Sequence, residues 1–212
     1  MFEKVVKLAI CAGGLFMVTA CATGTTNLSL GLTPDTVRTG LLSEVEGTTL
    51  TIASVDDERE AALRNRIGDK RNGYGMVMGE VGTDEPVVDI VKDTVVQTFE
   101  ANGHDVAEEG GLQVDIDVNR FWFDYKTGLV TVEFFGDIQI DLTVTTAAGE
   151  VVFEDEFKGY YSDKTGGGLS GTWTRVMDEA LSDLSKEISL SMELMEVLQE
   201  YGAAAPEGDA IS

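Results

Sequence analysis

Residues 112–119 read LQVDIDVN and decide the fold class, because apolar and polar residues alternate there without a break. This period of two places the aliphatic side chains on one face of a β-strand and the polar side chains on the other. After Arg120, the aromatic run FWF at 121–123 loses the phase, which predicts a β-bulge or the end of the strand. The tripeptide KTG at 126–128 predicts a turn, so the chain should reverse its direction there.

Two more alternating stretches follow at 130–144 and 151–161, with Gly149 in the turn between them. Antiparallel strands joined by short turns commonly have one face on the core and one face in water, which suits this alternation. The three stretches therefore predict an antiparallel meander with its aliphatic face buried.

Helical spacing flanks the meander on both sides. Residues 88–99 carry apolar side chains at steps of three and four, between Pro86 in the first turn and the stop signal NG at 102–103. A second apolar seam runs over residues 177–198. Because this seam is longer than a small sheet can cover, we expect a kink near 189–191 or an overhanging end.

The strand candidates before the first helix are residues 48–55 and 76–81, and the polar stretch 58–75 between them is interpreted as irregular. The resulting order, ββαβββα, favours an α+β fold. We expect a two-layer sandwich of an antiparallel sheet with two helices packed on one face. This domain is predicted to span residues 47–201, with a disordered tail over 202–212.

The N-terminus has the organisation of a signal peptide over residues 1–20. Lys4 and Lys7 precede an apolar run that is typical of an h-region and too short to span a bilayer. Residues 18–21 then read VTAC, which resembles the lipobox of bacterial lipoproteins. A lipobox combines an aliphatic residue, two small residues and the Cys that becomes lipidated.

This resemblance implies cleavage between Ala20 and Cys21 and lipidation of Cys21. Several acyl chains on one residue give stable membrane anchoring. Residue 22 is Ala rather than the Asp that retains such proteins in the inner membrane, which implies the outer membrane of a diderm bacterium, on its periplasmic face. Residues 21–46 are then the lipidated Cys and a tether that includes one edge strand.

Composition limits the possible functions. The 212 residues suffice for one ordinary domain, and 38 acidic against 15 basic residues give a formal net charge of −23. This excess disfavours binding to nucleic acid and adhesion to anionic lipid through a basic face. One His and two Cys leave little from which to build a zinc site, a Cys/His nucleophile pair or a disulfide framework.

Two short motifs have weak catalytic or metal-binding potential. The run DIDVN at 115–119 resembles the start of a calcium loop, but Arg120 and Lys126 occupy the positions that need Gly and Glu. His104 stands beside Asp105 without a recognisable nucleophile. We therefore expect a protein that is not an enzyme and that has no cofactor and no metal site.

Two groups of residues are candidate contact sites. The first is a dense basic cluster in a strongly acidic chain, which indicates either internal ion pairs or an anion or partner contact. The second is an aromatic group near the first turn of the meander, of which the core should absorb about half and leave the rest as an exposed patch. The basic cluster is Arg64, Arg66, Lys70 and Arg71. The aromatic group is Phe121, Trp122, Phe123, Tyr125, Phe134 and Phe135, and its first four members are the candidate aromatic patch.

The layout as a whole resembles the YajG family of bacterial lipoproteins. The shared features are the lipobox, a leucine-alternating tether, a strand ending in Asp56-Asp57, the basic stretch RNRIGDKRNGYG at 64–75, a helix closing on Ala-Asn-Gly, a meander and a long terminal helix. The same plan is similar to accessory lipoproteins of lipopolysaccharide assembly and of lipid-trafficking ABC systems. The YajG resemblance implies no established activity.

These observations favour a non-catalytic, membrane-anchored lipoprotein that binds an envelope protein partner in assembly or transport. The alternative is a binding module for a lipid or a cell-wall fragment, and a hydrolase comes third. A binding module should contain a cavity between its helices and its sheet, whereas a partner-binding protein should be closed and should carry an exposed patch.

Overall fold

A computed structural model describes residues 24–60, 63–72, 74–166 and 170–202. Within these ranges the chain has one mixed sheet of eight strands, three α-helices and a short 3-10 helix, so the predicted α+β class is confirmed. The strands are β1 (Thr26–Leu28), β2 (Thr49–Asp57), β3 (Arg66–Arg71), β4 (Val77–Thr83), β5 (Asp105–Val106), β6 (Leu112–Thr127), β7 (Val132–Thr145) and β8 (Val151–Thr165); the helices are η1 (Leu41–Glu44), α1 (Val87–Ala101), α2 (Ser170–Ser189) and α3 (Met192–Gly202).

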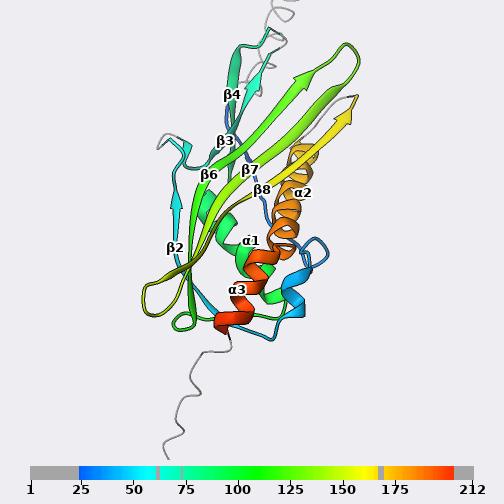
Figure 1. The fold of residues 1–212 in the computed structure, drawn as a ribbon. Helices are drawn as coiled ribbons and strands as arrows, with labels where there is room; N and C mark the ends of the chain where they lie inside the picture. The colour runs from blue at the N-terminus through cyan, green and yellow to red at the C-terminus, as the bar shows by residue number, and fades with distance from the viewer. Residues whose placement is uncertain (1–23, 61–62, 73, 167–169, 203–212) are drawn as a thin grey trace, which may run out of the picture.

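Strands β6, β7 and β8 form the antiparallel meander that the alternation predicts (Figure 1). A register shift between Val118 and Arg120 moves the buried positions of β6 from even to odd residue numbers. Strand β6 therefore continues through the aromatic run and does not end there. Its inward side chains are Leu112, Val114, Ile116 and Val118 before the bulge, and Phe121 and Phe123 after it.

The rest of the sheet corrects the prediction, because β2 runs parallel to β6 and β1 runs parallel to β4. A hairpin and helix α1 lie between β2 and β6, and a crossover of this kind returns the chain in the same direction. The stretch 58–75, interpreted as irregular, contains β3, which pairs with β4 and meets β6 at Gly68 and Phe123. The sheet is thus mixed, and the order ββαβββα lacks β1, β3 and β5.

Helix α2 packs closely on the buried side of the meander. A Cβ atom at Gly159 of β8 would lie 2.2 Å from the backbone oxygen of Ala180, and one at Gly136 of β7 would lie 2.9 Å from the sulfur of Met177. Helix α1 lies beside α2, where the hydroxyls of Thr98 and Ser185 are hydrogen-bonded at 2.8 Å. The two glycines thus let the helix backbone approach the sheet and close the space between the layers.

The predicted kink in the terminal helix is confirmed, because α2 ends at Ser189 and α3 begins at Met192. Two serines stabilise the break. The Ser189 hydroxyl donates to the carbonyl of Lys186 at 2.9 Å, and the Ser191 hydroxyl accepts the amide of Leu194 at 3.2 Å. Ser191 therefore acts as the N-cap of α3.

The N-terminal segment packs on the domain over residues 24–46, where the sequence predicts a tether. Leu28 and Leu42 are buried in the core, and the amide of Gly31 donates to the Asp178 carboxylate of α2 at 3.1 Å. The predicted edge strand is β1, whose partner is β4. The signal peptide, Ala20 and Cys21 lie outside the described residues, as does the tail from residue 203.

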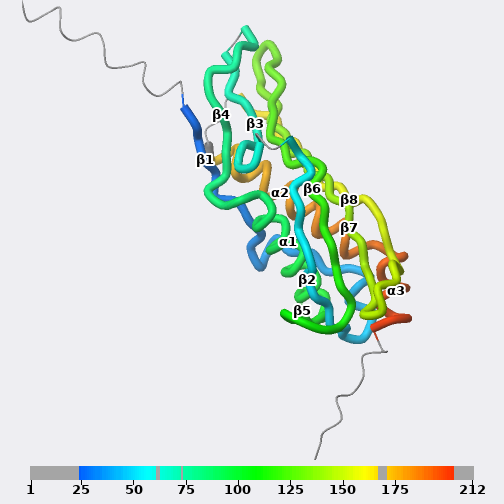
Figure 2. Tube along the Cα trace, turned by 90° about the vertical axis from the view of Figure 1, so that its left-hand side faces the viewer, coloured from blue at the N-terminus to red at the C-terminus, as the bar shows by residue number. Residues whose placement is uncertain are grey.

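The sheet extends beyond its helices at one end of the molecule. The β3–β4 hairpin and the turn between β6 and β7 project together past the start of α2 (Figures 1 and 2). Along the described part of the chain, no helix has the length and apolar content needed to cross a membrane.

Candidate functional site

The predicted basic cluster lies on and beside β3, and two of its members are paired internally. Arg66 bonds the Asp69 carboxylate and lies 3.4 Å from Glu80, while Arg71 lies 3.3 Å from Asp69 and 4.0 Å from Asp124. The hydrogen bond to Asp69 raises the pKa of the Arg66 guanidinium. Of the two predicted roles, internal ion pairing therefore applies to Arg66 and Arg71, rather than contact with an external anion.

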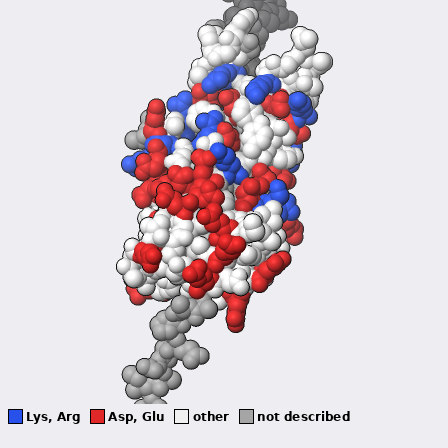
Figure 3. Space-filling view, in the orientation of Figure 1, with Lys and Arg blue, Asp and Glu red and all other residues white. Residues whose placement is uncertain are grey.

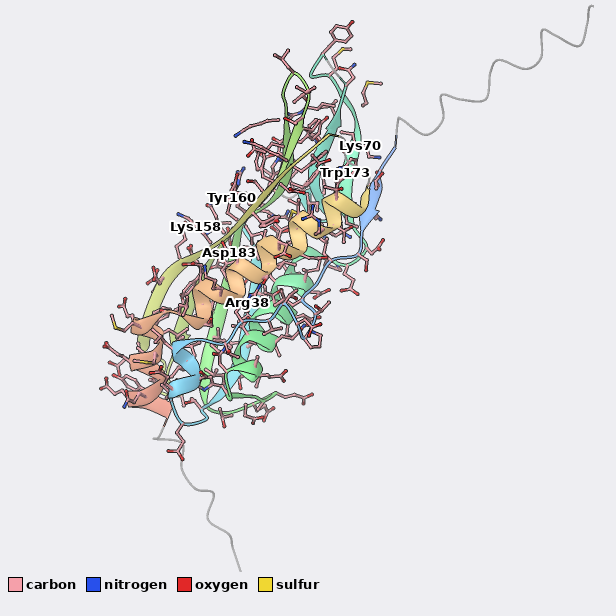
Figure 4. The ribbon with its side chains drawn as sticks, turned by 90° about the vertical axis from the view of Figure 1, so that its right-hand side faces the viewer. Arg38, Lys70, Lys158, Tyr160, Trp173 and Asp183 are labelled. Atoms are coloured by element: carbon pink, nitrogen blue, oxygen red, sulfur yellow. The ribbon has the colours of Figure 1, made fainter. Side chains whose placement is uncertain are left out.

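The other two members have different surroundings. The Lys70 ammonium donates to the backbone oxygen of Gly24 at 2.8 Å, which places Lys70 against the N-terminal segment (Figure 4). The Arg64 side chain is exposed and forms no ion pair with any described residue. The structure thus does not gather the four cations at one site.

The sequence analysis missed Arg59, the most completely satisfied cation of this region. Its buried guanidinium donates two bonds of 2.7 Å to the Asp57 carboxylate. It also donates to the backbone oxygens of Arg64 at 2.7 Å and Phe121 at 3.2 Å. Arg59 therefore fixes the chain between β2 and β3 onto β6; the spacing Asp-x-Arg at the end of a strand was its only signal.

The predicted aromatic patch is corrected, because Phe121 and Phe123 are fully buried. The bulge before them turns these two rings inward, where Phe123 packs on Trp173 of α2 with ring centroids 5.4 Å apart. Trp122 and Tyr125 remain half-buried. The Tyr125 hydroxyl accepts the amide of Arg71 at 2.7 Å and donates to its carbonyl at 2.6 Å, which joins the two projecting hairpins.

An exposed apolar surface lies instead at the ends of these hairpins. We call residues 70–72, 74–79 and 125–132 the hairpin tips. Tyr74 is 92% exposed and Val130 is 87% exposed, and Leu129 is fully exposed. The further exposed apolar side chains of the tips are Met76, Val77 and Met78. The sequence analysis predicted a turn and a short strand here but no exposed apolar surface.

A second surface lies on the open face of the sheet, where four carboxylates stand side by side across four strands. Asp56 of β2 faces Asp117 of β6, Asp117 faces Asp141 of β7, and Asp141 faces Glu156 of β8. We call these four residues the carboxylate ladder. Acidic side chains form a broad band over this face in Figure 3. The alternation predicts that these residues face water, but their alignment depends on the register.

The electrostatics of the carboxylate ladder are unfavourable to the fold. Burial raises the pKa of Asp117, and the nearby charges of Asp56, Asp141 and Asp115 raise it further. Lys158 pairs with Glu156, but no described cation pairs with the three aspartates. Like charges directly opposite each other on neighbouring strands destabilise a sheet. The ladder is thus a cost to stability that packing does not explain.

His104 has a structural role. Its Nδ1 accepts the amide of Thr48 at 3.2 Å, so the other nitrogen, Nε2, carries the proton and donates to the carbonyl of Leu42 at 3.1 Å. Burial lowers the pKa of His104, which keeps the ring neutral. Both nitrogens are therefore occupied in holding η1 and the residue before β2 to the segment after α1.

Hollows that the described residues line lie at the surface. One, of about 430 Å³, lies beside α3 and the end of η1 and is lined by Glu44, Val45, Glu46, Gly47, Leu198, Gln199 and Gly202. The described residues hold no group of three or more His, Cys, Asp or Glu placed to bind a metal ion.

Comparisons with known proteins identify a family and a shared fold. Residues 42–199 match the model of a family described as "Uncharacterized lipoprotein". A crystal structure of a protein from Xanthomonas campestris is 16% identical and superposes with a TM-score of 0.54, over 84% of this chain and 99% of that one. A minor lipoprotein from Acinetobacter baumannii is 10% identical, with a TM-score of 0.38 over 68% of this chain and 92% of that one. No curated protein matches this chain.

Proposed function

The chain belongs to this family of uncharacterized lipoproteins, as its resemblance to the YajG family led us to expect, and we propose that it is a non-catalytic anchor for a protein partner. In this proposal Cys21 is lipidated and holds the domain on the periplasmic face of the outer membrane. The domain then presents the open face of its sheet to a second envelope protein.

The carboxylate ladder is the observation that carries the partner-binding role. Asp56, Asp117 and Asp141 face one another in register on a face of the sheet that no described helix covers, and like charges in this arrangement weaken the sheet. A basic partner segment laid across the sheet relieves this repulsion on binding. Complementary charge also speeds encounter and selects the partner.

The packing between the layers argues against the alternative of a lipid or cell-wall-fragment binding module. Such a module needs a cavity between helix and sheet, and cavities that hold small ligands have volumes of about 300–1,000 Å³. Here Gly159 and Gly136 bring α2 directly onto β8 and β7. This close packing of α2 on the meander supports the proposal of a partner-binding protein.

In-cell cross-linking of the tagged full-length chain, read by mass spectrometry, tests the proposal. The test variant is Asp117→Asn with Asp141→Asn, which removes two ladder charges but keeps the shape. The matched control is Glu108→Gln with Glu109→Gln, two exposed carboxylates outside the ladder. Cys21→Ser serves as the unanchored form.

We expect the wild type and the control to capture the same protein and the ladder variant to capture about tenfold less, which corresponds to about 1.4 kcal/mol of binding. Capture should also be lost in Cys21→Ser. Equal capture by the ladder variant would contradict the role of the ladder. Capture of a lipid or glycan without a protein would instead favour the binding module.

A further inference from the structure

We propose that the hairpin tips contact the bilayer that holds the lipid anchor, so that the domain stands on the membrane at this end. The inference rests on the proposed lipidation of Cys21 and adds a second, non-covalent contact between the folded domain and the lipid. Its chemistry is that of an interfacial apolar surface with flanking cations, for which the matching ligand is an anionic phospholipid bilayer.

The position of the N-terminal segment brings the membrane to this end of the molecule. The Lys70 ammonium donates to the backbone oxygen of Gly24 at 2.8 Å. A Cβ atom added to Gly79 of β4 would lie 2.5 Å from the same oxygen, so Gly24 packs directly against β4. Cys21 is three residues before Gly24, and three extended residues span at most about 11 Å. A lipid on Cys21 therefore holds the β3–β4 hairpin within about 11 Å of its attachment point.

The side chains at the tips suit a lipid interface. Tyr74, Leu129 and Val130 are almost fully exposed, and Met76 and Met78 of the first tip are exposed as well. Tyrosine is typical of the level of the headgroups, where its ring is apolar and its hydroxyl is wet. Transfer of exposed apolar side chains from water to the acyl boundary of a bilayer lowers the free energy.

The charges at the tips are opposite to those of the rest of the chain. The hairpin tips contain Lys70, Arg71 and Lys126 and no Asp or Glu; acidic residues begin directly beside them, and two of these, Asp69 and Asp124, pair with Arg71. Figure 3 shows white, uncharged atoms at this end, blue side chains just below them and the acidic band farther down. Anionic headgroups attract the cations and repel the acidic body, and both effects orient the same end toward the lipid.

The two tips also form one firm unit. Tyr125 joins β6 to the backbone of Arg71 through two hydrogen bonds, and β3 meets β6 at Gly68 and Phe123. Trp173, at the start of α2, packs on Phe123 and closes the core below the tips (Figure 4). These contacts hold the two apolar ends side by side.

Site-specific labelling of the full-length lipoprotein tests the inference. The sequence contains only Cys11 and Cys21, and processing removes the first and acylates the second, so an introduced Cys is the single free thiol. An environment-sensitive fluorophore is attached to Leu129→Cys in the tip and, as the matched control, to Ala148→Cys in the opposite turn between β7 and β8. Both proteins are reconstituted into vesicles of phosphatidylethanolamine with a quarter of phosphatidylglycerol, with or without brominated acyl chains.

We expect both proteins to float with the vesicles, and brominated lipid to quench the label at residue 129 about twofold or more while residue 148 is unaffected. Flotation without quenching at 129 would overturn the tip contact and leave the lipid anchor intact. Equal quenching at both positions, or a blue shift at 129 that lipid does not quench, would also overturn it; the second result would place another copy of the chain against the tip. Failure to float would overturn the proposed anchor and the tip contact that rests on it.

Discussion

Strands β6 and β7 pass through two regions with opposite surfaces. Beneath α2, their inward side chains are buried, and their outward side chains include Asp117 and Asp141 of the carboxylate ladder. Beyond the start of α2, the same two strands end in a turn over residues 128–131, in which Leu129 and Val130 are exposed and which contains no charged residue. The comparison teaches that the covering helices, rather than the strands, decide which face of this sheet is a core and which is a contact surface.

Removal of Arg59, which fixes the chain between β2 and β3 onto β6, has the largest expected effect. Arg59→Met leaves Asp57 and three backbone carbonyls without their donor, and loss of one partner from a buried pair costs about 3–5 kcal/mol. Urea unfolding measures the change. Arg64→Met, at an exposed and unpaired position, should stay within about 0.5 kcal/mol. Equal changes in the free energy of unfolding for both substitutions would show that Arg59 does not fix the chain between β2 and β3 onto β6.

The close approach of α2 to the covered region is tested by Gly159→Ala. The added methyl group meets the backbone oxygen of Ala180, which cannot move without shifting the helix, so we expect a loss of about 1–3 kcal/mol. Gly166→Ala, whose Cβ would meet nothing, is the control. Thermal unfolding distinguishes the two. If Gly159→Ala is neutral, the layers are not closed and the binding-module alternative regains support.

Asp178 of α2 makes the stability of the covered region depend on pH. Burial raises its pKa to about 6, above the 3.8 of an ordinary Asp, so the unfolded chain ionises first as the pH rises. Its contribution to stability is therefore greatest below about pH 4 and is lost as the pH rises through about 6. Asp178→Asn should stabilise the protein by on the order of 1 kcal/mol at about pH 8 and have no such effect at about pH 4. A gain that is the same at both pH values would contradict this assignment.

The smallest expected effect is that of Leu129→Ser in the uncovered region. The side chain is fully exposed, so the free energy of unfolding in water should change by less than about 0.5 kcal/mol. Leu142→Ala, a buried position of the covered part of β7, should cost about 2–5 kcal/mol. A large destabilisation by Leu129→Ser would mean that the tip packs on the domain and is not a free surface.

Local periodicity predicted much of this fold, and long-range register decided the rest. The alternation after Leu112 and the seam ending at Leu198 gave the meander and the broken helix, because each depends on neighbouring residues alone. Strand β3 was missed because Gly68 and the charged residues after it show no alternation. The parallel pairing of β2 with β6 joins segments about 60 residues apart, and no local signal encodes it.

The contact surfaces were harder to predict than the fold. The basic and aromatic residues were conspicuous in the sequence, but Arg66 and Arg71 are paired within the protein and Phe121 and Phe123 are in the core. The carboxylate ladder exists only through the pairing of four strands. The hairpin tips exist only because α2 starts too late to cover them.

Photo-cross-linking in whole cells tests most directly the claim that the two surfaces have different partners. A photoreactive amino acid is placed at Leu129 in one full-length chain and at Asp141 in another. We predict that residue 129 forms adducts with phospholipid and that residue 141 forms an adduct with a protein. Protein adducts at 129, or lipid adducts at 141, would contradict the account.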